Sequence, residues 1–206
     1  MTGATAGGKL NMKSKRIETR VLTGVAIFTA IVVVLQLLGS FVRFGPFSVS
    51  LVLIPIVVGA AMYGAGAGAW LGFVFGMAVL LSGDAAAFLP ISPLGTVVTV
   101  LAKGTLAGLC AGLVFRLLEK KNTYVAVVAS AIVCPVVNTG VFLLGCFLFF
   151  METISQWAAG SGFENVGTYM IVGLVGLNFV VELVVDIVLS PIVVRLINIG
   201  KKGKAA

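Results

Sequence analysis

Residues 94–118 read LGTVVTVLAKGTLAGLCAGLVFRLL, and this run decides the fold class. Only two of its side chains, Lys103 and Arg116, carry a charge. A helix rises about 1.5 Å per residue, so a run of this length crosses the roughly 30 Å hydrocarbon core of a bilayer. The stretch therefore predicts a transmembrane helix.

The composition of the whole chain agrees with a membrane protein. Of 206 residues, 60% are hydrophobic and 10% are charged, whereas a soluble domain carries roughly 25% charged residues. This balance argues against a soluble enzyme, a disulfide-rich secreted domain and a disordered chain. The net charge of +7 comes mainly from short basic clusters between apolar runs. Such clusters are typical of cytoplasmic loops, and we predict no nucleic-acid partner.

Five further apolar runs accompany this one: 21–39, 49–62, 69–81, 123–150 and 169–199. Runs 49–62 and 69–81 are shorter than the about 20 residues that a spanning helix needs. They form either one re-entrant hairpin or two short helices joined by a glycine-rich turn at 63–68, which is the interpretation we favour. We expect the segment 151–168 to be a loop. The sequence thus predicts an all-α polytopic membrane protein with six transmembrane helices, and five or four full spans are the alternatives.

Basic residues set the orientation. The N-terminal segment, the connection after Arg116 and the C-terminal end hold 12 of the 14 Lys and Arg residues. With six helices these three parts lie on one side, which the positive-inside rule assigns to the cytoplasm. We expect a basic cytoplasmic segment over 1–20, a single membrane domain over 21–199 and a basic cytoplasmic tail over 200–206.

The sequence lacks the residues that several kinds of catalytic and metal site require. The chain has no histidine, and its three cysteines lie inside apolar runs without CxxC spacing. A catalytic triad would lack its base, and a zinc site would lack its usual ligands. We predict no catalytic residues, no metal and no cofactor. Glu182 with Asp186 is the one pair that an intramembrane enzyme acting on a lipid could use.

Lys103 is the most informative single residue. If its helix enters the membrane from the outer face near Leu94, Lys103 lies about 12 Å deep. A cation at that depth indicates a functional site, because burying it unpaired is costly. Lys103 either binds a ligand or forms a structural ion pair with Glu182. Thr99 lies one turn nearer the outer face on the same side, so it is a candidate substrate-binding residue together with Lys103.

Polar residues also interrupt the last two runs. Asn138 follows Pro135 midway along run 123–150, and Asn178, Glu182 and Asp186 lie at four-residue spacing on one face of run 169–199. An amide suits a polar ligand, although it also forms interhelical hydrogen bonds. We therefore add Asn138, Asn178 and Glu182 to the substrate-binding candidates. The role of Asp186 stays open.

Two polar segments, 43–48 and 82–93, lie on the predicted outer side. They either close an outward-facing pocket, lined by the last three runs, or act as plain connectors. Arg43 in the first segment is a further substrate-binding candidate. Arg43 and Lys103 together favour a ligand with a carboxylate.

Small residues mark one face of the first run. Ala26 and Ala30 form an AxxxA step, and residues four apart share a helix face. Such a stripe lets another helix approach closely. It serves either a partner protein or packing within the bundle.

Taken together, this pattern resembles the substrate-binding S components of energy-coupling factor (ECF) transporters. Six predicted helices in 206 residues, basic termini on one side and the AxxxA step carry the resemblance. Four stretches add to it: SLVLIPIVVGA at 50–60, GFVFG at 72–76, KGTLAG at 103–108 and PVVNTG at 135–140. They are most similar to the branch that includes pantothenate and riboflavin carriers.

The resemblance implies a protein of a bacterial-type plasma membrane that binds a vitamin or related micronutrient at its outer side. It implies association with a membrane coupling subunit and two ATPase subunits, with Ala26 and Ala30 as the docking surface for the coupling subunit. The chain has no GxxxxGK[ST] phosphate loop of its own. A carboxylate such as pantothenate is the expected ligand, with riboflavin or another vitamin as alternatives. A self-contained secondary transporter is the other alternative, although no inverted repeat is visible.

Overall fold

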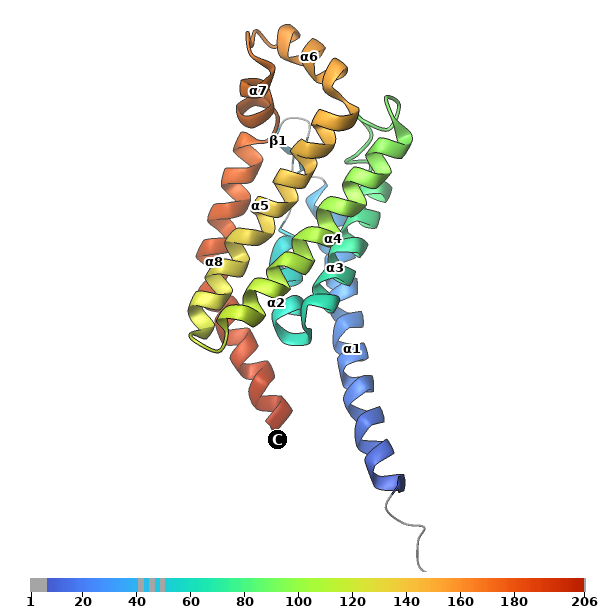
Figure 1. Ribbon diagram of the computed structural model, residues 1–206, viewed down its shortest axis with the longest axis vertical. Helices are drawn as coiled ribbons and strands as arrows, with labels where there is room; N and C mark the ends of the chain where they lie inside the picture. The colour runs from blue at the N-terminus through green and yellow to red at the C-terminus, as the bar shows by residue number, and fades with distance from the viewer. Residues whose placement is uncertain (1–6, 41–42, 45–46, 49–50, 206) are drawn as a thin grey trace, which may run out of the picture.

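The computed structural model describes residues 7–40, 43–44, 47–48 and 51–205, with side chains described over 19–40 and 51–199. Helices run side by side in one bundle (Figure 1). In chain order the elements are α1 Gly7–Gly39, strands β1 Arg43–Phe44 and β2 Phe47–Ser48, α2 Leu53–Tyr63, α3 Ala65–Ser82, α4 Pro93–Leu118, α5 Thr123–Phe149, α6 Met151–Gly160, α7 Val166–Thr168, the π-helix η1 Tyr169–Leu174 and α8 Gly176–Ala205. The two short strands pair antiparallel, with Arg43 opposite Ser48.

The helices confirm an all-α polytopic membrane fold but not the count of six spans. Within the described residues, four stretches are long and apolar enough to cross a membrane: Thr19–Gly39, Ala65–Ser82, Pro93–Leu118 and Thr123–Phe149. Val166–Leu174 and Gly176–Ile199, bent by 43°, make a fifth span if they count as one. The α2 helix has 11 residues and rises about 16 Å, roughly half of the hydrocarbon core.

The short α2 helix is a core element. Most of its residues are buried, among them Leu53, Ile56 and Val57, and the longer helices surround it (Figure 1). Gly64 alone joins α2 to α3, with φ of +96° that favours glycine. The turn predicted over 63–68 is therefore wrong in extent, because α3 already begins at Ala65.

Glycines bring α3 and α4 into direct backbone contact. A Cβ atom on Gly72 would collide with the backbone of Gly104, and one on Gly68 would collide with the backbone of Gly108. These pairs lie one helical turn apart on each helix, so the two backbones meet along a continuous seam. The seam fixes the rotation of α4 about its axis, and with it the direction of Lys103.

Two predicted segments differ from the structure. The segment 151–168, predicted as a loop, contains the ten-residue helix α6, which buries Ile154 and Ala158. Run 169–199, predicted as one helix, breaks into η1 and α8 at Val175. Gly173 and Gly176 flank this break, and glycine weakens a helix interior. Rare π-helical turns of this kind often occur at functional sites.

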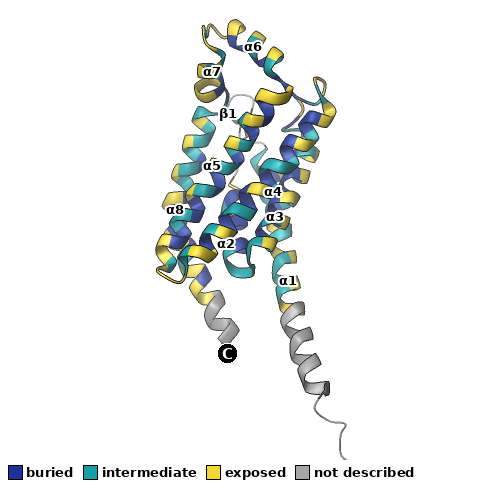
Figure 2. Ribbon diagram, viewed as in Figure 1, coloured by how far each residue is buried: buried dark blue, intermediate teal, exposed yellow. Residues whose placement is uncertain are grey.

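The two ends of the bundle are formed by different parts of the chain. The first turns of α1, the connection between α4 and α5 and the end of α8 lie at one end, and α6 and α7 lie at the other (Figure 1). This arrangement agrees with the predicted parity of the basic segments. Between the ends the outward side chains are largely apolar and exposed, as a lipid-facing surface requires, whereas buried residues gather inside (Figure 2).

Candidate ligand-binding cavity

A cavity of about 760 Å³, its mouth included, lies between α3, α4, α5 and α8. Its residues come from the end of α3, the first half of α4, the second half of α5 and the start of α8, so it occupies the half of the bundle near α6. The segment 83–92 between α3 and α4 forms part of its wall.

Lys103 of α4 reaches into the cavity, and its ammonium lies over two aromatic rings. Its Nζ is 5.3 Å from the ring centroid of Phe142 and 5.7 Å from that of Phe75. Cation–π contacts of this length stabilise a partly desolvated ammonium. Neither ring is a strong hydrogen-bond acceptor, so the ammonium keeps N–H donors for a ligand.

Two buried polar groups face the same space as Lys103. Thr99 is 4% exposed and Asn138 is 6% exposed, and both line the cavity. Within the described part of the chain, Thr99 Oγ1 and Asn138 Oδ1 have no hydrogen-bond partner. Buried polar atoms in proteins are nearly always hydrogen-bonded, so these two suit a polar ligand or ordered water.

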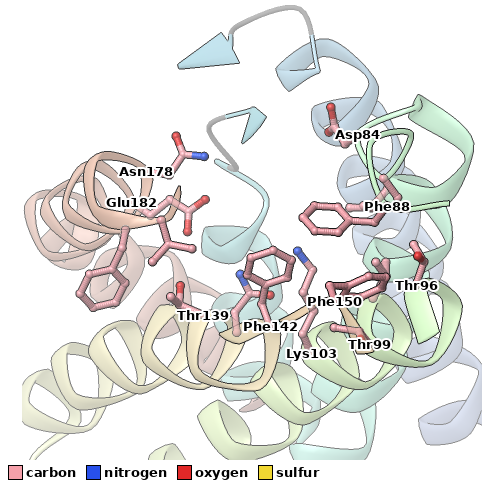
Figure 3. A pocket seen from close by; sticks show the side chains of 16 residues that line it. Asp84, Phe88, Thr96, Thr99, Lys103, Thr139, Phe142, Phe150, Asn178 and Glu182 are labelled. Atoms are coloured by element: carbon pink, nitrogen blue, oxygen red, sulfur yellow. The ribbon is translucent and has the colours of Figure 1, made fainter. Parts of the chain in front are cut away.

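Carboxylates and an amide line the α8 side and the 83–92 wall. Glu182 and Asn178 project from α8 toward Lys103, and Asp84 lies on the opposite wall (Figure 3). Asp84 Oδ2 accepts a hydrogen bond of 2.6 Å from Nε2 of Gln36 in α1. The described lining therefore combines one cation with two carboxylates.

Phenylalanine rings form the apolar part of the cavity. The ring centroid of Phe88 lies 5.0 Å from that of Phe150 and 5.8 Å from that of Phe142, in edge-to-face geometry. Trp157 of α6 packs on the outer side of Phe88 at 5.5 Å. These contacts join the 83–92 wall to α5 and α6, so the aromatic cluster also holds this end of the bundle together.

A family comparison decides between a transporter component and the other classes of membrane protein. The sequence profile described as "ECF transporter, substrate-specific component" matches residues 20–196. The chain belongs to this family. No curated protein and no solved structure gives a significant match.

As a substrate-specific component, the protein is a multi-pass membrane subunit of a transporter. Family membership implies a small-molecule substrate and association with the membrane and ATPase subunits of an ECF module. The match begins within α1 and covers most of α8, so the cavity lies wholly inside the region shared with the family.

Five of the six predicted substrate-binding residues of this ECF component surround one cavity. They are Thr99, Lys103, Asn138, Asn178 and Glu182. The sixth, Arg43, belongs to β1, and its side chain lies outside the described residues. Their role in binding a ligand stays a prediction. As predicted, α4, α5 and α8 line the cavity, and Val79 adds a contribution from α3 that was not anticipated. The 82–93 segment, predicted as a lid or a plain connector, contributes Asp84, Ala85 and Phe88 to the lining.

Ala26 and Ala30 are exposed on α1 and take no part in packing the bundle interior. Their small side chains lie among large exposed ones such as Ile27, Ile31 and Val34. The surface of α1 around Ala26 and Ala30 in this ECF component is therefore shallow, and a shallow surface allows another helix to dock closely.

Several cavity residues escaped the prediction. Thr96 precedes Lys103 by two helical turns, and Phe142 follows Asn138 by one turn, so a strict use of helix spacing would have found both. Asp84 lies in a segment that was predicted only as a possible lid. Phe150 caps the C-terminus of α5 and meets Phe88, which precedes α4 in the chain, so no local pattern encodes this pairing.

Proposed function

We propose that this ECF component captures an acidic micronutrient, with pantothenate as the best single candidate, in the cavity around Lys103. The observation that carries the proposal is the position of Lys103 in this cavity beside the buried polar side chains of Thr99 and Asn138. A ligand carboxylate would accept charge-assisted hydrogen bonds from Lys103, which are about twice as strong as neutral ones.

The carboxylates that line the cavity limit how many negative charges the ligand can carry. Glu182 and Asp84 face the same space as Lys103, so a ligand with several negative charges would meet repulsion. A single acid group together with hydroxyl, amide or amine donors fits better, because carboxylates accept hydrogen bonds. Pantothenate carries such donors, whereas a nucleotide or a phosphate ester adds charge without relieving the repulsion.

A second candidate ligand is a flat aromatic vitamin such as riboflavin. The edges and faces of Phe88, Phe142 and Phe150 offer an apolar surface that stacks with a planar ring. In that case Asn138, Asn178 and Thr99 would bind the polar edge of the ring, and Lys103 would not be decisive.

For transport, we propose that Ala26 and Ala30 dock the membrane coupling subunit in the plasma membrane, and that two ATPase subunits drive uptake. The exposed small-residue face of α1 supports this assignment. A self-contained secondary transporter would need no such partner. The two mechanisms therefore differ in whether the chain alone moves its ligand.

An uptake assay tests the function and separates these mechanisms. Cells without their own vitamin importers would express either the chain alone or the chain with an ECF module. They would receive radiolabelled pantothenate, riboflavin or folate. We expect ATP-dependent uptake of pantothenate only with the module. Uptake by the chain alone would support a secondary transporter, and uptake of riboflavin in place of pantothenate would favour the second ligand.

A further inference from the structure

Gln36 is a polar residue inside an apolar helix face. It lies in α1, is 1% exposed, and follows the buried Val32 by one turn. Its Nε2 donates to Asp84 Oδ2 at 2.6 Å and approaches Ser82 Oγ at 3.4 Å. A hydrogen bond from a buried amide to a carboxylate is among the stronger kinds in proteins.

Asp84 belongs to a wall that has little regular structure of its own. The segment 83–92 consists of successive turns between α3 and α4, and Asp84, Ala85 and Phe88 from it line the cavity. Its backbone hydrogen bonds are local, such as Ala86 N to Gly83 O at 3.0 Å. Such bonds set the shape of the turns but not where they lie relative to the helices.

Contacts with other elements locate this wall, among them the packing of Ala85 and Leu89 in the core cluster that includes Val32 of α1. Phe88 packs against the rings of α5 and α6 near one end, and Asp84 bonds to Gln36 of α1 at the other. Figure 3 shows Asp84 and Phe88 on the same side of the cavity, across from Glu182 and Asn178. Loss of the Gln36 contact would leave the Asp84 end without this anchor.

We propose that Gln36 is a positioning residue for the ligand cavity, which holds Asp84 and thereby keeps the 83–92 wall in its place. The inference deepens the proposed function and rests on it for the meaning of the cavity, although not for the hydrogen bond. The hydrogen bond between Gln36 and Asp84 then joins the helix that carries Ala26 and Ala30 to the cavity wall.

Hydrogen exchange of backbone amides in the purified full-length protein, without added ligand, tests this role. In Gln36→Leu the amides of 83–92 are expected to exchange about ten times faster or more, which is the size expected for a lost hydrogen bond to a charged group. Amides in the 119–122 connection, far from Gln36 in the bundle, are expected to exchange at the wild-type rate.

Thr29→Val provides the matched control. It removes another side-chain hydrogen bond of α1, the one that Trp70 Nε1 donates to Thr29 Oγ1 at 3.2 Å. Because Trp70 belongs to α3 and lies outside the cavity wall, this variant is expected to leave exchange in 83–92 unchanged.

A charge-swapped pair guards against a general folding defect. Gln36→Glu alone places a second carboxylate beside Asp84 and is expected to speed exchange in 83–92. Adding Asp84→Asn restores a donor–acceptor pair with the direction reversed, and wild-type exchange is expected to return. Unchanged exchange in a folded Gln36→Leu protein, or no rescue by the swapped pair, would overturn the proposal. A wild-type protein that binds no vitamin would refute the proposed function but not this result.

Discussion

Replacing Lys103 by methionine tests the ligand anchor. Methionine keeps most of the length of lysine, so its side chain still reaches the rings of Phe75 and Phe142 that lie 5.7 and 5.3 Å from Nζ. What disappears is the charge and its N–H donors. A hydrogen bond to a charged group contributes about 1.5–3 kcal/mol, and about 1.4 kcal/mol corresponds to a factor of ten in affinity. Lys103→Met should therefore weaken binding by roughly ten- to a hundredfold.

The assay is calorimetric titration of the detergent-solubilised protein with the vitamin that the uptake assay identifies, alongside its thermal stability. Lys120→Met makes the same substitution at an exposed position of the α4–α5 connection, and it should bind as the wild type does. If Lys103 serves only as an ion-pair partner of Glu182, its loss should lower folding yield, and adding Glu182→Gln should restore that yield. Unchanged affinity in a well-folded Lys103→Met protein would refute the anchor role and the preference for an acid.

Three further variants separate packing, binding and docking. Gly104→Ala should lower the melting temperature, because its Cβ would meet the α3 backbone, whereas Gly140→Ala, with open space around it, should not. Asn138→Leu should weaken vitamin binding about tenfold. It should also raise the melting temperature of the ligand-free protein, because it removes a buried oxygen that has no hydrogen-bond partner among the described residues. A variant that binds the vitamin normally would exclude Asn138 from the site. Ala30→Trp should abolish uptake by the assembled transporter while leaving vitamin binding by the solitary protein intact. Leu117 on α4 is 74% exposed, and Leu117→Trp serves as the control. Uptake that survives in Ala30→Trp would contradict docking of the coupling subunit on that face of α1.

Most of the fold followed from the sequence because hydrophobic length is a strong signal in membranes. The helices α4 and α5 end within one residue of their predicted limits. Their ends carry local signals: Ser92 caps α4 before Pro93, and Asn122 caps α5 through its side chain. The sequence failed where length and composition say little, as at the amphipathic α6 and the break at Val175.

The sequence predicted those site residues that stand out within a single apolar helix. An isolated cation at Lys103 and the polar stripe of Asn178 and Glu182 stand out against an apolar background, and the structure brings them to one cavity. The contact between Gln36 and Asp84 was not predictable, because 48 positions separate the two residues. The two residues meet because α1 packs against α3 in the folded bundle, and no local sequence pattern encodes that packing.

Mass spectrometry of the small molecules released from the purified protein tests the central claim most directly. The protein would be isolated without added vitamin from cells grown in rich medium, washed and denatured. We expect one acidic micronutrient in near-stoichiometric amount from the wild type and from Ala30→Trp, and much less from Lys103→Met and Asn138→Leu. Release of no small molecule by the wild type, or of equal amounts by all four proteins, would contradict capture of a ligand in this cavity.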